Sequence, residues 1–243
     1  MKKNKVLKPL AIMMASSMLL AGTMSIFAEE ATPKSETSTA TVSFEIDNET
    51  TDPVNPVVPT DPTDPTDPGD IDGGNGEGPL AITAFPKAMN FGGHKVGKGT
   101  QKFESNLLKP NIQIQDKRGA ASDGWNLSVA LSDFTNNEAS DAGKTTKGII
   151  TFNNTTMFEG NNTPSQKEPS NVNNKVVVES GKTTQIASAS KGEGLGTWGF
   201  HWYAPNYKTD STNSNVTLEM DTNTVVSGSY SADLEWTLSA TPQ

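Results

Sequence analysis

From Leu80 onward, apolar residues recur at every second position in short runs, and no window repeats with the period of a helix. Such alternation places successive side chains on opposite faces of a strand. The runs are 112–115, 125–131, 149–152, 175–179, 198–203, 216–220 and 230–238. Gly, Asn, Asp and Pro separate them, which is typical of all-β proteins. We therefore expect an antiparallel β-sandwich or barrel-like domain over residues 79–243, with surface loops at 136–147 and 160–174.

The composition excludes several kinds of site. The chain has no cysteine, so it can form no disulfide and offers no thiolate to a metal or substrate. Two histidines, His94 and His201, are too few for most catalytic or metal sites built on histidine. We expect His94 in a turn, and His201 has no obvious carboxylate or metal co-ligand. No nucleophile elbow, phosphate loop or metal-ligand spacing is present. We expect no metal, no cofactor and no catalytic residue, and the net charge of -9 argues against nucleic acid as a partner.

The negative charge is concentrated in one part of the chain. Residues 1–28 carry four lysines and no acid, whereas residues 29–78 carry thirteen acids and one lysine. The expected domain, 79–243, is therefore close to neutral. Its charge gives no indication of its partner.

Residues 1–28 have the organisation of a secretory signal peptide. A basic stretch, 1–8, precedes an apolar run, 10–27, and Ala28 stands before two glutamates, which fits cleavage near Ala28. The alternative is an uncleaved anchor, but the run is short and interrupted by Ser, Thr and Gly. Because no second apolar run, lipid-bearing Cys or sorting motif follows, we expect a secreted protein without a membrane span. It would leave the cell or be held at the surface by non-covalent contacts.

The segment that follows divides into two parts. Residues 29–50 contain one strand pattern, Thr41–Ile46, which could pair with the later domain or with another chain, or could belong to a disordered tail. Residues 51–78 repeat Thr-Asp-Pro and end in a Gly-rich stretch, which indicates an acidic, extended linker of polyproline type. A faint likeness to a calcium loop at 70–77 fails the EF-hand pattern, so a plain linker is the better interpretation.

Two Trp-x-Leu triplets, Trp125-Asn126-Leu127 and Trp236-Thr237-Leu238, lie on two of the expected strands. Each triplet puts a Trp and a Leu on the same strand face. Asp116-Lys117-Arg118-Gly119 precedes the first triplet, and Gly192-Glu193-Gly194-Leu195-Gly196-Thr197-Trp198 stands between the two. With the signal, the Thr-Val-Ser-Phe strand, the Thr-Asp-Pro linker and Phe91-Gly92, these motifs resemble the WxL domain of surface proteins from low-GC Gram-positive bacteria. The resemblance covers nearly the whole chain, as in a small, single-domain member.

The resemblance implies non-covalent attachment at the cell wall, with the domain contacting peptidoglycan. It also implies assembly with other surface proteins of the same kind, including a membrane-anchored partner. We therefore expect a non-enzymatic wall-binding protein. The alternative is a structural subunit held at the surface by such a partner rather than by peptidoglycan, and a wall hydrolase is a third hypothesis.

The candidate binding residues are Trp125, Leu127, Trp236 and Leu238 of the two triplets. Their side chains either fill the core or form a surface platform for sugar rings or a partner, and the strand alternation favours the core. A second aromatic concentration, 198–207, offers a possible contact surface formed by Trp198, Trp202, Tyr203 and Tyr207. Its alternative role is packing of a strand against its own loop.

Overall fold

The computed structural model describes residues 71–73, 77–138, 143–160 and 167–240. The expected signal peptide, the strand pattern at 41–46 and most of the acidic linker lie outside these residues. The regular secondary structure of the described residues consists of strands and one short 3-10 helix, η1 (Gly119–Ala121). Ile71–Gly73, which falls inside the range expected as linker, forms the first strand.

The strands are short and follow one another closely. The first eight are β1 (Ile71–Gly73), β2 (Leu80–Pro86), β3 (Thr100–Ser105), β4 (Asn111–Asp116), β5 (Gly124–Leu131), β6 (Phe134–Asn136), β7 (Thr145–Thr146) and β8 (Ile149–Asn153). The other eight are β9 (Thr156–Glu159), β10 (Asn171–Val172), β11 (Lys175–Glu179), β12 (Thr183–Ser190), β13 (Gly196–His201), β14 (Asn213–Asp221), β15 (Tyr230–Ser231) and β16 (Leu234–Ser239).

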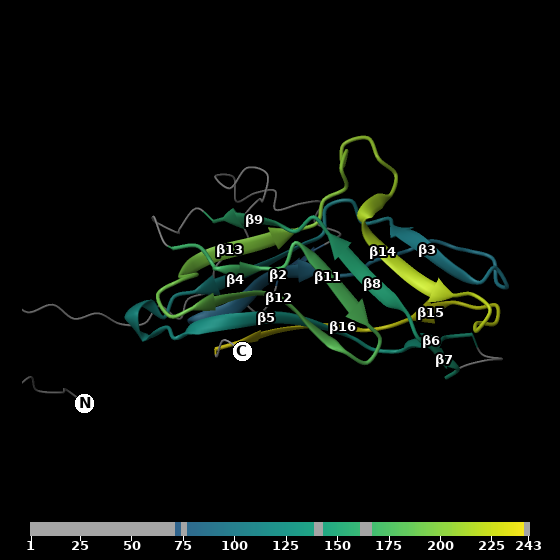
Figure 1. Ribbon diagram of the computed structural model, residues 1–243, viewed down its shortest axis with the longest axis horizontal. Coiled ribbons are helices and arrows are strands. Elements are labelled where there is room, and N and C mark those ends of the chain that lie inside the picture. Colours follow the sequence, from purple (N-terminus) through teal and green to yellow (C-terminus); the bar gives the residue numbers. More distant parts are fainter. Residues whose placement is uncertain (1–70, 74–76, 139–142, 161–166, 241–243) are drawn as a thin grey trace, which may run out of the picture. The chain divides into compact units, whose positions relative to one another are not determined.

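These strands pair antiparallel into four sheets (Figure 1). Sheet A has the order β1-β2-β4-β13-β9, sheet B the order β11-β8-β14-β3, sheet C the order β10-β12-β5-β16, and the small sheet D the order β15-β6-β7. Many neighbours are far apart in sequence, as in β4 with β13 and β5 with β16. The predicted all-β, antiparallel fold class is confirmed.

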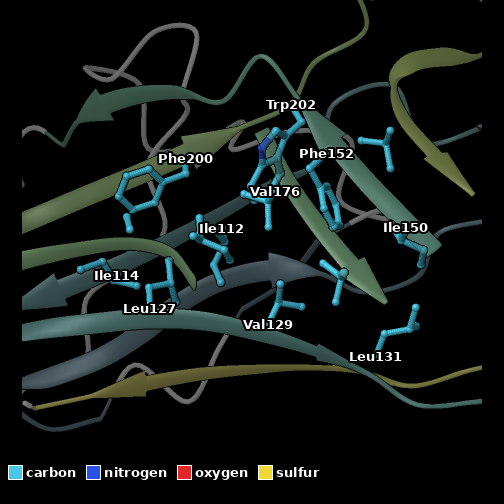
Figure 2. Packing of buried hydrophobic residues seen from close by; sticks show 14 of the residues in the cluster. Ile112, Ile114, Leu127, Val129, Leu131, Ile150, Phe152, Val176, Phe200 and Trp202 are labelled. Atoms are coloured by element: carbon cyan, nitrogen blue, oxygen red, sulfur yellow. The ribbon is translucent and has the colours of Figure 1, made fainter. Parts of the chain in front are cut away.

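One hydrophobic core is shared by sheets A, B and C. Sheet A contributes Ile112, Ile114, Trp198 and Phe200, sheet C contributes Trp125, Leu127, Val129 and Ile186, and sheet B contributes Ile150, Phe152, Val176 and Leu218. Figure 2 shows the side chains of Leu127, Val129 and Leu131 on β5 pointing towards this cluster, with Trp202 beside Phe152. Burial of aromatic and aliphatic area is the main force that holds such layers together.

Several strands carry too few large apolar residues for the alternation to reveal them. β12 reads Thr-Thr-Gln-Ile-Ala-Ser-Ala-Ser, yet it lies between β10 and β5 in sheet C. Its Ala187 and Ala189 are buried, and small side chains there leave room for the neighbouring Trp125. The sequence analysis missed β2, β3, β6, β9 and β12, and the two expected loops contain the short strands β7 and β10.

Candidate functional site

The first Trp-x-Leu triplet is a core element. Trp125 and Leu127 on β5 are both 0% exposed. The indole Nε1 of Trp125 donates a hydrogen bond of 3.0 Å to the carbonyl oxygen of Gly194, and the ring meets Phe200 edge-on with centroids 6.4 Å apart. Gly194 has φ of 64° and leaves no room for a Cβ beside the indole. The Gly-rich segment therefore closes over the tryptophan at a position that only glycine fits.

The segment before β5 is fixed by a buried ion pair. Arg118 donates from Nε and Nη2 to the two carboxylate oxygens of Asp116 at 2.9 and 2.8 Å, and from Nη2 to the carbonyl oxygen of Gly124 at 2.7 Å. Ser122 Oγ donates to Asp116 as well. This bidentate arrangement ties the end of β4 to the beginning of β5. It explains the Asp-Lys-Arg-Gly motif as a structural support for the first triplet.

The second triplet lies beside the first. β16 pairs with β5 so that Leu238 faces Leu127 and Trp236 faces Val129. β16 is an edge strand, and Trp236 and Leu238 are half-buried rather than buried. The Trp236 ring lies 6.1 Å from Trp202 and 5.9 Å from Phe152. The structure thus brings one motif residue together with the aromatic segment 198–207.

The aromatic segment divides between two faces of sheet A. Trp198 and Trp202 point into the core, where Trp202 Nε1 donates to Thr155 Oγ1 at 2.9 Å. The rings of His201 and Tyr203 are tilted by 38° with centroids 4.2 Å apart, and Tyr203 meets Tyr207 edge-on with centroids 5.4 Å apart. Tyr203 is buried and Tyr207 half-buried. The candidate contact surface therefore reduces to the tyrosines, while the two tryptophans stabilise the fold.

A groove that the sequence analysis did not anticipate lies between the segments 85–96 and 225–234. Its volume is about 1130 Å³, and Phe134, Ile150, Leu218 and Met220 from sheets B and D belong to its lining. The aromatic walls include Phe91, His94, Phe103 and Tyr230. His94 stacks on Phe103 at 3.8 Å with an interplanar angle of 17°. Leu234, the first residue of β16, also lines the groove, so it is continuous with the second motif strand.

The rim of the groove combines exposed apolar groups with polar ones. Val96 and Val226 are 47% and 39% exposed, and they are two of the three large apolar side chains that are exposed in the described part of the chain. The third, Val177 at 38%, lies on β11 outside the groove. Lys87, Asn90 and Lys95 supply polar atoms. An exposed apolar rim around a hollow is typical of a binding surface.

Hydrogen bonds hold the turns of the rim segments in place, whereas Tyr230 and Ser231 are held by the pairing of β15 with β6. Asn90 receives the backbone N–H of Asn106 on its carbonyl at 2.7 Å, and its Oδ1 accepts from Gly92 N–H at 2.8 Å. Tyr230 Oη accepts from the N–H of Val226 at 3.2 Å. Turns of this kind do not show the alternation of apolar and polar residues by which strands are predicted. A cluster of Met, Phe, Val and Tyr within Gly- and Ser-rich stretches is the only sequence signal that marks them.

Lys167 and Glu193 form an ion pair in which the carboxylate is shielded from solvent. Glu193 is buried, and its carboxylate accepts a hydrogen bond of 2.6 Å from Lys167 Nζ. This hydrogen bond is the main reason why the pKa of Glu193 falls to about 2, and a hydrogen bond from Ser170 lowers the pKa further. The described residues contain no group of three His, Cys, Asp or Glu side chains placed to hold a metal ion. They also contain no helix long and apolar enough to cross a membrane.

Comparison with known proteins supplies the context for these features. Neither the curated proteins nor the solved structures contain a match to the chain. A family model described as the WxL domain, surface cell wall-binding, matches residues 31–242. That range covers both Trp-x-Leu triplets, the groove and nearly all of the chain, and so the chain belongs to the WxL domain family.

Proposed function

We propose that the mature protein is a non-enzymatic cell-surface protein that associates non-covalently with the Gram-positive cell wall, and that the groove contacts peptidoglycan. The family match carries this proposal, because it describes a surface cell wall-binding domain over nearly the whole chain. The groove supports it, since it is a large hollow whose walls include aromatic rings.

The chemistry of the groove suits a glycan strand. Sugar rings present C–H faces that pack against aromatic side chains, and Phe91, His94, Phe103 and Tyr230 offer such faces. Hydroxyl and acetamido groups need polar partners, which Asn90 and the serines of 225–234 provide. Lys87 and Lys95 would complement the carboxylates of the wall polymer.

The two Trp-x-Leu triplets have an indirect part in this proposal. Trp125 and Leu127 hold the sandwich together from the inside. Trp236 and Leu238 lie on the half-buried edge strand that begins at the groove. We propose Trp236 and Leu238, together with Tyr203 and Tyr207, as secondary contacts for the wall or for a partner protein.

The alternative is attachment through a membrane-anchored surface protein of the same system. In that case the half-buried edge strand β16 or the groove would receive a protein segment instead of a glycan. Assembly with other surface proteins is compatible with wall binding, because the protein has more than one candidate contact surface.

Washed, protein-free cell walls test the proposal. Purified mature protein beginning near Glu29 should sediment with the walls and should be released by denaturant without cleavage of a covalent bond. The double variant Val96→Asp/Val226→Asp places two acids on the rim and should weaken retention at least about tenfold, a loss of about 1.4 kcal/mol. Val177→Asp is the matched control, since it makes the same change at a similarly exposed site outside the groove.

Three other results would contradict the proposal. Retention that only appears after a partner protein is added would favour the structural alternative. Release of soluble sugars from the walls would reveal a hydrolase. Equal retention of the Val96→Asp/Val226→Asp and Val177→Asp variants would exclude the groove as the contact surface, while leaving wall association itself intact.

A further inference from the structure

The two walls of the groove differ in charge. The wall formed by segment 85–96 carries Lys87 and Lys95, both of which are exposed. The wall formed by segment 225–234 carries three serines and Asp233, the one acid among the described residues that line the groove. The Asp233 carboxylate already accepts a hydrogen bond of 2.8 Å from Lys147 Nζ, and Lys147 does not line the groove. The positive charge of the first wall is therefore not matched by the second.

The lysines of the first wall are also unpaired. In the part of the chain that the structure describes, neither Lys87 nor Lys95 takes part in an ion pair. Lys98 continues the same segment and is exposed as well, and segment 85–98 contains no acid. Because the domain as a whole is close to neutral, these lysines form a local concentration of positive charge. Positive charge along the wall of a hollow attracts anionic groups.

The floor of the groove favours a ligand that also has apolar groups. Ile150 on β8, with Leu218 and Met220 on β14, presents the inner face of sheet B to the hollow. Val96 and Val226 add exposed apolar surface at the rim. Apolar surface of this kind contributes to binding only when the ligand removes it from water. A ligand made of hydroxyl and phosphate groups alone has nothing apolar to place there.

In the wall polymer, negative charge and apolar groups occur together in the peptide. Its alanine residues carry methyl groups, and free carboxylates lie on the same short chain. Its backbone amides need polar partners, and Ser227 and Ser229 on the second wall supply hydroxyl groups. The peptide is therefore the component of the polymer that matches both the cationic wall and the apolar floor.

We propose that the groove recognises the peptide part of peptidoglycan, that Lys87 and Lys95 bind its free carboxylates, and that the apolar floor receives its methyl groups. This role rests on the proposed function, because it assigns one component of the wall polymer to the same groove. Lysine ammonium groups form charge-assisted hydrogen bonds with carboxylates. Amidation of a carboxylate removes its charge, so Lys87 and Lys95 make the protein distinguish free from amidated peptides.

Synthetic peptides test the proposal on the mature protein. The probe is L-Ala-γ-D-Glu-L-Lys-D-Ala-D-Ala with both carboxylates free, and the comparison is the same peptide with both carboxylates amidated. We expect titration calorimetry to show at least about tenfold tighter binding of the free form, and this preference should fall below about twofold in Lys87→Gln/Lys95→Gln. Lys102→Gln/Lys175→Gln is the matched control, since it removes two exposed lysines of sheet B that do not line the groove. Equal affinity of the wild type for the two peptides, or no binding of either, would overturn the proposal.

Whole cell walls separate the failure of this proposal from the failure of the proposed function. Amidation of the wall carboxylates with carbodiimide and ammonia should reduce retention of the wild type several-fold, whereas retention of Lys87→Gln/Lys95→Gln should not depend on amidation. Unchanged retention of the wild type would overturn the proposal and leave wall association intact. Removal of phosphate polymers with hydrofluoric acid should not change retention, and a large loss would assign the lysines to phosphate and overturn the proposal. If the wild type were not retained by any walls, the proposed function would be contradicted, and this proposal with it.

Discussion

At the residue scale, the two motif tryptophans differ in burial, and therefore in how much stability the protein should lose when each is replaced. Trp125 is fully enclosed and hydrogen-bonded through its indole, whereas Trp236 lies on an edge strand and keeps part of its ring exposed. The sequence could predict that both rings share a face with aliphatic residues. It could not predict their difference, because that depends on which strand forms the edge of sheet C.

Trp125→Ala should lower the free energy of unfolding by about 3–5 kcal/mol, the usual cost of truncating a buried aromatic residue. Trp236→Ala should cost less, because only part of its ring leaves an apolar environment. Urea midpoints of both variants show which substitution destabilises the protein more, and Trp125→Phe serves as the conservative comparison. If Trp125→Ala unfolds at the wild-type urea concentration and yet fails to bind walls, the tryptophan is a contact rather than a core residue.

Arg118 should be as important for folding as a core side chain. Its removal leaves the Asp116 carboxylate buried without its cation, and breaking a buried pair typically costs about 3–5 kcal/mol. We expect Arg118→Ala to lower the urea midpoint strongly and Arg118→Lys to restore only part of it, because lysine lacks the bidentate geometry. Lys191→Ala removes an exposed ion pair with Asp123 and should leave the midpoint unchanged. Similar midpoints for the Arg118 and Lys191 variants would contradict this view.

His201 should make stability depend on pH. Burial lowers the pKa of its imidazole from 6.5 to about 4, and its Nδ1 is shielded without a hydrogen-bond partner in the described structure. Between these two values the unfolded chain binds more protons than the folded one, so stability falls as the pH drops from about 6.5 to 4. The loss is at most about 2–3 kcal/mol, because solvent screens a ring that is still partly exposed.

Urea midpoints at several values between pH 7.5 and pH 4 measure this contribution. In His201→Gln the slope between pH 6.5 and pH 4 should decrease. A His201→Gln variant with the full wild-type slope would assign the pH dependence to other groups.

At the element scale, the pairing of β5 with β16 joins the two motifs into one structure. Leu127 and Leu238 face each other across this pair, so their side chains should interact directly. We expect the double variant Leu127→Ala/Leu238→Ala to differ from the sum of the single variants by about 0.5–3 kcal/mol. Additive losses for the facing pair would show that the motifs act independently.

The elements that could be predicted are those with large apolar residues on one face. β4, β5, β8, β11, β13 and β14 all follow the alternation. The expected strand at 230–238 is instead two strands, because β15 pairs with β6 while β16 pairs with β5. The point where one strand ends and the next begins depends on which strand each one pairs with. A local sequence pattern does not show that partner. The groove was missed for a similar reason, since its rim segments 85–96 and 225–234 meet only in the folded chain.

At the scale of the whole molecule, truncation should separate the acidic segment from the fold. Removal of residues 29–78 should leave a folded β domain, although it deletes β1 and the Gly78 carbonyl that accepts from Gln115. We expect a loss below about 3 kcal/mol, since a larger change requires a core-level cause. Removal of residues 29–50 alone should cost less. A thermal melt that loses cooperativity after the longer deletion would make the segment an integral part of the domain.

The pairing of distant strands also determines when the domain can fold. Leu127 and Leu238 are paired although they lie 111 residues apart in the sequence, and β3 likewise pairs with the distant strand β14. Contacts between distant residues form slowly, because a long loop must close before they contribute. A growing chain therefore cannot complete sheets B and C until its final strands are available. We propose that this delay favours export, because the N-terminal sequence predicts a secretory signal and an unfolded chain crosses a membrane more readily than a folded one.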